Sequence, residues 1–252
     1  MAVPLFASHI PTSYFQKTLL TFGAGLGSFL RPSNDELIAT FGEVTAYQAL
    51  VHMRKKMTEH PEGRKILKER PLINSHTVDF AQLKECPRGT FGEAYLNFLE
   101  TNGVSPDTRK RVHFVDDDEL AYVMQRYREI HDLVHTLLGM KTNMLGEITV
   151  KWIEALQFGL PMCVLAGIFG PWRLKTKHRQ LYLTTYLPWA IDTGWKSQFL
   201  LNVYFEQRWH SPLSHLRQEL HLPNPPPFAG TNQYDIQLLK AAPDTTFTTD
   251  KL

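Results

Sequence analysis

Hydrophobic and polar residues alternate along most of this chain with the period of an α-helix. Alternating, β-branched runs of the kind that form strands are scarce, and prolines separate the helical stretches. The pattern predicts an all-α fold. The predicted helices cover residues near 13–28, 34–57, 62–69, 90–101, 116–140, 147–158, 176–207 and 211–220.

The clearest of these helices spans residues 116–140. Asp116, Asp117 and Asp118 are suited to capping its first turn and to interacting with the positive end of the helix dipole. Apolar residues then recur at helical spacing and form one stripe, which predicts burial of that face. His131 lies within the stripe and His135 at its edge, so both imidazoles are expected to point inward. The stripe comprises Leu120, Val123, Met124, Tyr127, Ile130, Val134, Leu137 and Leu138.

These two histidines belong to the sequence HDLVH, which is followed after eleven residues by Glu147. An α-helix turns about 100° per residue, so His131 and His135 lie roughly 40° apart on one face. Asp132 lies on the same side, about 60° from His135. Glu147 would be about 18 Å further along a continuous helix, so the chain must turn back to bring it close. The residues that allow such a turn are Gly139, Asn143 and Gly146.

A helix that ends near Gly139 and a second that begins near Glu147 would bring four ligand-type side chains together. Imidazole and carboxylate groups that converge within about 2.0–2.2 Å of one point are suited to zinc or another divalent ion. The spacing therefore predicts a metal site between the long helix and the helix that follows it. The predicted ligands are His131, Asp132, His135 and Glu147.

Three other interpretations of this motif stay open. The histidines could be core residues whose ring nitrogens are satisfied by backbone or carboxylate groups. The second interpretation is a zinc-protease site of the HExxH type, although in that motif a Glu that acts as general base occupies the position of Asp132. A His-Asp pair is found in metal-dependent phosphohydrolases of the HD type. Those enzymes need a further His upstream and an Asp downstream, for which the candidates are His113 and Asp192.

Length and composition are those of one globular domain. The chain has 252 residues, enough for a substantial core, with 43% apolar and 21% charged residues. We expect an N-terminal segment over 1–12, a helical domain over 13–222, and a Pro-rich linker with a disordered or partner-bound tail over 223–252. The net charge of +2 gives no reason to expect nucleic acid as a partner. The two cysteines, Cys86 and Cys163, indicate a reducing compartment.

Two apolar segments could contact a membrane. Residues 156–172 are too short to span a bilayer and contain Pro161, but they end in Trp172 and a basic cluster. An apolar segment, an interfacial Trp and basic residues are typical of peripheral membrane contacts. A buried helix followed by a solvated loop explains the pattern equally well, and residues 13–32 have the same ambiguity. The basic cluster comprises Arg173, Lys175, Lys177 and Arg179.

The sequence around the motif, HDLVH…GEITVKWIEALQFGLP, resembles the signature region of the coenzyme Q biosynthesis protein 4 family. The similarity extends from about residue 11 to residue 222 and includes FGEVTAYQALVHMR, WRLKTKHRQLYLTTYLPWAIDTGW and FEQRWHSPLSHLRQEL. The resemblance implies a mostly helical, zinc-binding homo-oligomer, peripheral on the matrix face of the mitochondrial inner membrane, in a complex with other ubiquinone-biosynthesis enzymes. The N-terminal residues lack the Arg-rich pattern of a transit peptide, so this location rests on the resemblance alone.

The activity implied by the resemblance is that of a carboxy-lyase, 4-hydroxy-3-methoxy-5-polyprenylbenzoate decarboxylase, with or without coupled hydroxylation at ring C1. The metal would act as a Lewis acid that holds the substrate oxygens. A proton donor is also needed. Glu154 and Lys151 lie on the helical face of Glu147 and could reach the site, although an exposed Glu147–Lys151 pair would have the same spacing.

The alternative function is a non-catalytic scaffold that binds polyprenyl lipid, organises the ubiquinone-biosynthesis complex and holds a structural metal. Four protein ligands would favour this alternative, because a catalytic zinc ion usually keeps one coordination position for water or substrate. The number of protein ligands therefore bears directly on the choice between an enzyme and a scaffold.

Overall fold

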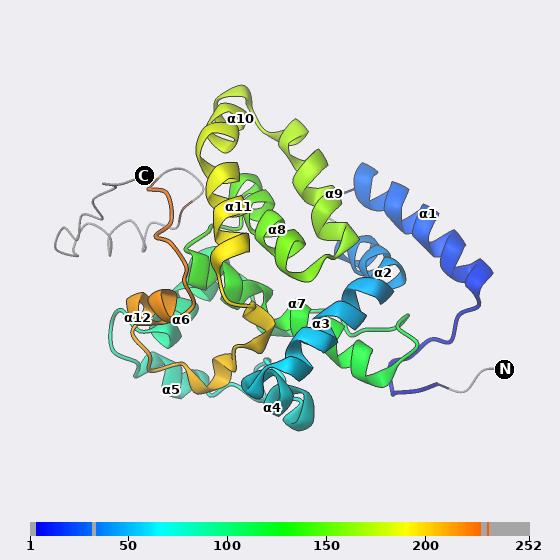
Figure 1. Ribbon diagram of the computed structural model, residues 1–252, viewed down its shortest axis with the longest axis horizontal. Helices are drawn as coiled ribbons and strands as arrows, with labels where there is room; N and C mark the ends of the chain where they lie inside the picture. The colour runs from blue at the N-terminus through cyan, green and yellow to red at the C-terminus, as the bar shows by residue number, and fades with distance from the viewer. Residues whose placement is uncertain (1–3, 32–33, 228–230, 232–252) are drawn as a thin grey trace.

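The computed structural model describes residues 4–31, 34–227 and 231, which form one helical domain (Figure 1). These residues contain no strand, so the all-α prediction is confirmed. The α-helices are α1 (Tyr14–Leu30), α2 (Asp35–Thr45), α3 (Tyr47–Glu59), α4 (Pro61–Glu69), α5 (Phe80–Lys84), α6 (Phe91–Asn102), α7 (Asp118–Leu138), α8 (Met144–Phe158), α9 (Pro161–Phe169), α10 (Thr176–Leu181), α11 (Leu187–Lys196) and α12 (Leu213–Glu219). The short turns are η1 (Pro106–Thr108), η2 (Gly170–Arg173), η3 (Tyr182–Tyr186), η4 (Leu200–Asn202) and η5 (Phe205–Gln207).

Helix α7 lies inside the domain and is buried on nearly every side. Asp117 caps its first turn by accepting a hydrogen bond from the Leu120 N–H at 2.8 Å, and Gly139 ends it in a left-handed conformation with φ 66°. The predicted helix 116–140 is therefore confirmed, but the side opposite the apolar stripe is not solvated. Its buried charges are satisfied inside the protein, for example by the ion pairs of Arg126 with Glu206 and of Arg128 with Glu43.

Two of the predicted helices are divided. The segment 34–57 forms α2 and α3, which meet at Ala46. The segment 176–207 begins as α10, passes through η3, which is a π-helical turn, and continues as α11. Pro188 accounts for the wider turn, because it has no N–H to donate to the carbonyl one turn earlier and η3 lies directly before it.

A buried glutamine explains why the chain after α11 is not helical. Gln157 on α8 donates hydrogen bonds from Nε2 to Ser197 Oγ at 2.7 Å and to Gln198 O at 3.0 Å, and its Oε1 accepts the Leu200 N–H at 3.0 Å. These bonds hold the segment away from a helical path, and only the turns η4 and η5 follow. The prediction of a continuous helix to residue 207 was therefore wrong. Helices α5 and α9 were not predicted.

Helix α8 lies between α7 on one side and α9 and α11 on the other (Figure 1). Two glycines let α9 and η2 come close to α8. A Cβ atom on Gly167 would lie 2.8 Å from the Trp152 ring, and one on Gly170 would lie 2.3 Å from the Ile148 side chain. Side chains at these two positions would push α9 away, so the glycines fix the α8–α9 packing.

The C-terminal segment is described only in part. Of the predicted linker and tail, residues 223–252, the structure describes only 223–227 and Thr231, which is buried and forms an isolated bridge with Met140. The predicted division into segments 1–12, 13–222 and 223–252 stays a prediction. Within the described part of the chain, no helix has both the length and the apolar character needed to cross a membrane.

Candidate metal centre

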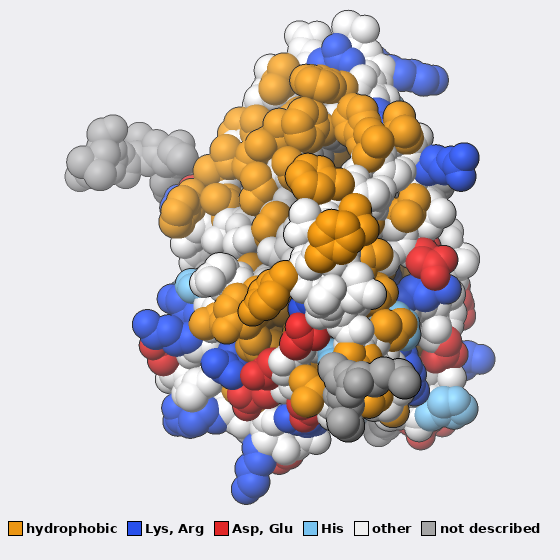
Figure 2. Space-filling model, turned by 90° about the vertical axis from the view of Figure 1, so that its right-hand side faces the viewer, with side chains coloured by type: hydrophobic (Ala, Val, Ile, Leu, Met, Phe, Trp, Pro, Cys, Tyr) orange, Lys and Arg blue, Asp and Glu red, His pale blue; other side chains and the backbone are white. Residues whose placement is uncertain are grey.

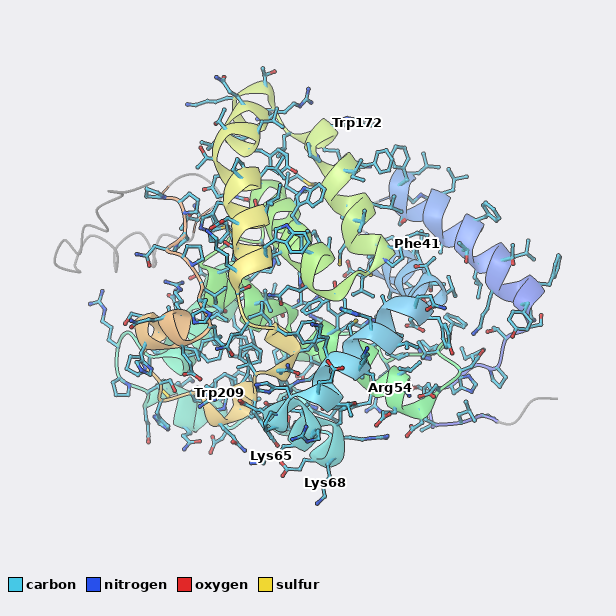
Figure 3. The ribbon with its side chains drawn as sticks, viewed as in Figure 1. Phe41, Arg54, Lys65, Lys68, Trp172 and Trp209 are labelled. Atoms are coloured by element: carbon cyan, nitrogen blue, oxygen red, sulfur yellow. The ribbon has the colours of Figure 1, made fainter. Side chains whose placement is uncertain are left out.

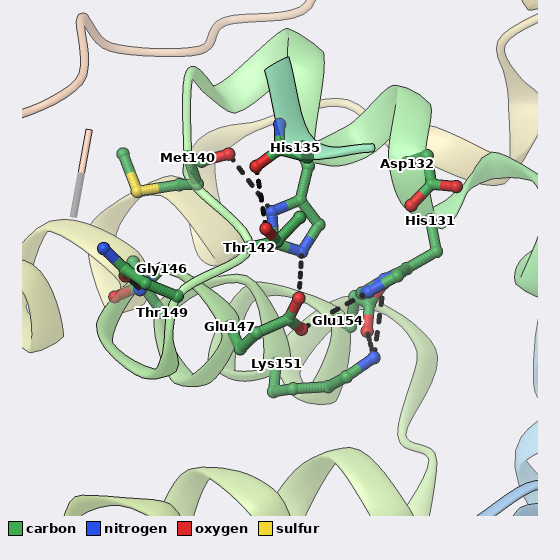
Figure 4. Close-up of polar contacts among 12 residues, drawn as sticks. His131, Asp132, His135, Met140, Thr142, Gly146, Glu147, Thr149, Lys151 and Glu154 are labelled. Carbon is green, nitrogen blue, oxygen red and sulfur yellow. Dashed lines mark hydrogen bonds and ion pairs between the residues drawn. The ribbon is translucent and has the colours of Figure 1, made fainter. Parts of the chain in front are cut away.

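Both histidines of the motif and its glutamate meet between α7 and α8 (Figure 4). His131 and His135 project from adjacent turns of α7 with their ring centroids 4.7 Å apart, and Glu147 projects from the first turn of α8. The Oε2 atom of Glu147 lies 3.5 Å from His131 Nε2, and its Oε1 atom lies 3.5 Å from His135 Nε2. The three donor atoms lie within 4.8 Å of one another, so a single ion could contact all of them.

The start of α8 depends on its N-cap residue, Asn143, and on Gly146 in its first turn. Asn143 caps the helix by accepting a hydrogen bond from the Gly146 N–H at 2.9 Å. A Cβ atom on Gly146 would lie only 2.0 Å from the Lys141 carbonyl oxygen, so the turn requires glycine. The predicted reversal of the chain is confirmed, but the second helix begins at Met144, almost one turn earlier than predicted. Glu147 consequently lies inside the first turn of α8.

Each histidine uses Nδ1 within the protein and keeps Nε2 for the site. His131 Nδ1 lies 2.6 Å from Glu154 Oε1, and His135 Nδ1 lies 3.2 Å from Met140 O. Because carboxylate and carbonyl oxygens accept hydrogen bonds, both Nδ1 atoms carry the proton and both Nε2 atoms present a lone pair. His135 Nε2 is buried and has no hydrogen-bond partner among the described residues. An ion shared with Glu147 would supply that partner, so these residues fit a metal site.

Asp132 is not brought together with the other three predicted ligands. Its buried carboxylate forms an ion pair with Arg109, which lies in the segment before α7. Figure 4 shows this carboxylate directed away from the space between His135 and Glu147. The structure therefore assembles three of the four predicted ligands. A role for Asp132 as a ligand stays a prediction, and it would require Asp132 to leave Arg109.

The two predicted proton donors contact each other beside His131: Lys151 pairs with buried Glu154 and not, as in the alternative, with Glu147 on an exposed surface. Lys151 Nζ donates to Glu154 Oε2 at 2.7 Å, and the Tyr127 hydroxyl donates to the same oxygen at 2.9 Å. Burial alone would raise the pKa of Glu154, but Lys151 and His131 beside it lower that pKa well below its ordinary value. Glu154 is thus an ionised carboxylate that holds its neighbours in place.

Tyr127 is a site residue that the sequence did not identify. It occurs in the apolar stripe of α7, where an aromatic residue is expected to pack in the core. Its hydroxyl is the part that reaches Glu154, and Lys151 Nζ also donates to it at 3.1 Å. A buried tyrosine usually needs a partner for its hydroxyl, and this is the one signal that could have indicated a polar neighbour.

The residues required by the HD-type alternative are not assembled. His113 Nδ1 donates to Ser8 O at 2.7 Å, and Asp192 pairs with Lys196 on α11 at 2.6 Å. Neither belongs to the group of potential ligands. The alternative of satisfied core histidines explains the Nδ1 contacts but leaves the buried Nε2 atom of His135 with no hydrogen bond, only the 3.5 Å contact with Glu147 Oε1. A metal site accounts for both sets of observations.

Comparison with known proteins identifies the family of this chain. The family model described as coenzyme Q (ubiquinone) biosynthesis protein Coq4 matches residues 6–226. The chain is 52% identical over 222 residues to the mitochondrial ubiquinone biosynthesis protein COQ4 homolog of Bos taurus, covering 88% of this chain and 84% of that protein. It is 48% identical over 225 residues to the Homo sapiens protein of the same name, covering 89% and 85% of the two chains.

A solved structure has the same fold. The crystal structure of a putative ubiquinone biosynthesis protein from Nostoc punctiforme superposes with a TM-score of 0.65, covering 84% of this chain and 99% of that one. Its sequence identity of 21% makes this a likeness of fold alone. The family match and the identity to the curated relatives confirm the resemblance found in the sequence. This chain belongs to the coenzyme Q (ubiquinone) biosynthesis protein Coq4 family.

Proposed function

We propose that this chain acts in ubiquinone biosynthesis as a metal-dependent carboxy-lyase. The substrate would be a 4-hydroxy-3-methoxy-5-polyprenylbenzoate, from which the C1 carboxylate is removed. The observation that carries this proposal is the number of converging ligands: His131, His135 and Glu147, rather than four. Three protein ligands are typical of catalytic zinc sites, which keep a position for water or substrate. This count favours an enzyme over a scaffold with a closed structural site.

The reaction needs an electrophilic site and a proton. A divalent ion on this donor set, zinc in the first instance, would supply Lewis acidity toward the substrate oxygens. The proton adds to ring C1, the bond from C1 to the carboxyl carbon breaks, and its electrons return to the ring as carbon dioxide leaves. No oxidant is consumed, whereas coupled hydroxylation would also require oxygen. The ring product therefore distinguishes the two versions of the reaction.

Lys151 is the better placed of the two proton-donor candidates. Burial would lower the pKa of Lys151, but the neighbouring Glu154 raises it above its ordinary value, so the amine keeps its proton. Glu154 accepts hydrogen bonds from both Lys151 and His131, which gives it a positioning role. In this assignment Lys151 holds the proton, and Glu154 with Tyr127 fixes where Lys151 and His131 lie.

The proposal includes a cellular setting. The chain would associate peripherally with the matrix face of the mitochondrial inner membrane, as a homo-oligomer and beside other ubiquinone-biosynthesis enzymes. The relatives are named as mitochondrial proteins, which supports the compartment. Both apolar segments noted in the sequence expose large hydrophobic side chains, which supports contact with a lipid surface.

The decisive experiment supplies metal-loaded protein with a soluble, short-chain prenylated hydroxybenzoate and measures released carbon dioxide. Elemental analysis should find one divalent ion per chain. His135→Ala should lose both the ion and the activity, while His215→Ala, which changes an exposed histidine on α12, should keep both. Full metal content in His135→Ala would remove the proposed site. A loaded wild-type protein that binds the substrate but releases no carbon dioxide would establish the scaffold instead.

A further inference from the structure

The chain returns to the metal centre after α12. The described residues of this segment are 223–227 and Thr231, which we call the C-terminal strap, and Figure 1 shows its first part in orange beside α11. The Trp189 Nε1–H on α11 donates to the Asn224 carbonyl oxygen at 3.0 Å. Pro226 is buried, and Thr231 has no exposed surface. The strap is therefore packed into the domain at both of its described parts.

The side chain of Thr231 is held by two hydrogen bonds. Its hydroxyl donates to the carbonyl oxygen of Pro226. The Tyr186 hydroxyl lies 3.2 Å from Thr231 Oγ1, and it donates there because Thr231 has already used its own proton. Both Tyr186 and Thr231 are fully buried, so the bond between them is not exposed to solvent. Because Tyr186 is the last residue of η3, these bonds fix Thr231 to that turn.

The backbone of Thr231 meets the loop that follows α7. Thr231 forms an isolated antiparallel bridge with Met140, the second residue after the end of α7. The Met140 carbonyl oxygen accepts the His135 Nδ1–H at 3.2 Å, a contact drawn in Figure 4. A carbonyl group that accepts this proton fixes the tautomer of the imidazole and the direction of its ring. A continuous series of contacts thus joins Tyr186 to a predicted metal ligand.

The two histidines of the metal centre are held in different ways. His131 Nδ1 lies 2.6 Å from the carboxylate of Glu154, which belongs to helix α8. His135 depends on one neutral carbonyl group in a loop, at a distance near the long end for an N–H···O bond. The Met140 N–H also donates to the His135 carbonyl oxygen at 2.9 Å, and the bridge with Thr231 adds a second restraint on Met140. A small displacement of Met140 would therefore loosen His135 and leave His131 in place.

We propose that Thr231 is a positioning residue for the metal ligand His135. The strap holds Met140 so that its carbonyl group directs the His135 ring and presents Nε2 to the ion shared with Glu147. The family match covers residues 6–226 and so does not include Thr231. The inference deepens the proposed function, and it rests on that function only in that the ion belongs to the proposed metal centre.

Titration of zinc against a competing chelator measures the effect on the site. Thr231→Val keeps the shape of the side chain and loses both hydrogen bonds, so it should lower zinc affinity. Removing an outer partner of a metal-binding His typically lowers affinity 10–100-fold, and Thr231 acts through Met140, so the expected loss is about tenfold. Tyr186→Phe removes one of the two bonds and should lose less. Thr231→Ser keeps the hydroxyl and should bind zinc like wild type.

A second measurement needs no metal. In metal-free protein with isotope-labelled histidine, magnetic resonance follows the exchange of each imidazole Nδ1–H with solvent. Thr231→Val should speed exchange at His135 by about fivefold, the equivalent of one typical hydrogen bond. Exchange at His131 should stay unchanged, because Glu154 and not the strap holds that ring. A general loss of stability would instead speed both exchanges, so the ratio of the two rates separates positioning from folding.

Tyr204→Phe is the matched control for Tyr186→Phe. It also removes a hydrogen bond from a buried tyrosine, because the Tyr204 hydroxyl donates to Glu69 at 2.7 Å. Lys65 Nζ lies 5.1 Å from the centre of the Tyr204 ring, and Figure 3 places Lys65 at the lower end of the molecule. Zinc affinity and both exchange rates should keep their wild-type values. Figure 2 shows exposed hydrophobic side chains on the side of the molecule opposite the strap in Figure 1, so the strap variants leave that surface unchanged.

Three results would overturn the inference. Thr231→Val could keep wild-type zinc affinity, it could speed exchange at His131 and His135 equally, or Thr231→Ser could lose as much affinity as Thr231→Val. Wild-type protein that binds no ion would instead overturn the proposed function. Faster exchange at His135 alone in metal-free Thr231→Val would in that case still show that the strap orients His135.

Discussion

Replacing Glu154 by Gln would remove one buried negative charge behind the metal centre while keeping the size of the side chain. The carboxylate accepts hydrogen bonds from His131 Nδ1 at 2.6 Å, from Lys151 Nζ at 2.7 Å and from the Tyr127 hydroxyl at 2.9 Å. A Gln side chain has one acceptor oxygen and an NH2 group, so it cannot serve all three donors. The Lys151 ammonium would lose its anionic partner, and His131 would lose the group that orients it.

Two effects of different size follow from these contacts. Removing one partner of a buried ion pair typically costs about 3–5 kcal/mol of stability. We therefore expect the free energy of unfolding of the metal-free protein to fall by about 3–5 kcal/mol. Removing the partner of a metal-binding His typically lowers metal affinity 10–100-fold, or about 1.4–2.8 kcal/mol. Adding Lys151→Met to Glu154→Gln removes the unpaired charge, so it should recover stability but not metal affinity.

Urea unfolding of metal-free protein measures the first effect, and titration against a competing chelator measures the second. Glu100→Gln, at an exposed position near the end of α6, is the matched control and should change neither quantity. Wild-type stability together with wild-type metal affinity in Glu154→Gln would refute the positioning role of Glu154. A double variant as unstable as Glu154→Gln would show that the unpaired Lys151 is not the cause of the loss.

Further predictions concern the first turn of α8, the pair of Asp132 with Arg109, and the ion. Gly146→Ala should lower the free energy of unfolding by about 1–3 kcal/mol in urea, because its Cβ would collide with the chain at 2.0 Å, whereas Gly23→Ala, with open space around it, should be neutral or stabilising. Arg109→Gln should destabilise the protein by leaving Asp132 unpaired and should not raise metal affinity in a chelator titration; a rise would show that Asp132 becomes a ligand. Removing the ion with a chelator should lower the melting temperature measured by calorimetry, since the ion binds only the folded state.

The features that could be predicted from the sequence depend on local spacing. His131 and His135 are one helical turn apart, so their rings lie on the same side of α7. Gly139 predicts the end of one helix and Asn143 the start of the next, and the chain does reverse between them. Glu147 follows His135 after only eleven residues, so this local turn is enough to bring its carboxylate to the two histidines.

The features that could not be predicted depend on residues far apart in the chain. Asp132 pairs with Arg109, 23 residues earlier, in a segment with no periodic pattern. Gln157 donates a hydrogen bond to Ser197, 40 residues later in the chain, and this contact helps to end a helix that the local sequence favours. Spacing along one helix can place a side chain on a side of that helix, but it does not identify what covers that side. The predicted fourth ligand was placed on the correct helix and has a different partner.

In the proposed metal centre, the pair of Asp132 with Arg109 would also determine the net charge. Lys151 and Glu154 neutralise each other, and Arg109 neutralises Asp132. A divalent ion held by two neutral histidines and one glutamate would therefore leave a net charge of about +1. With Asp132 as a further ligand that charge would be zero. A substrate that carries a carboxylate is attracted by the positive centre, and more strongly in a buried site than in water. Under the proposed function, Arg109 would thus favour substrate binding by keeping Asp132 away from the ligand group.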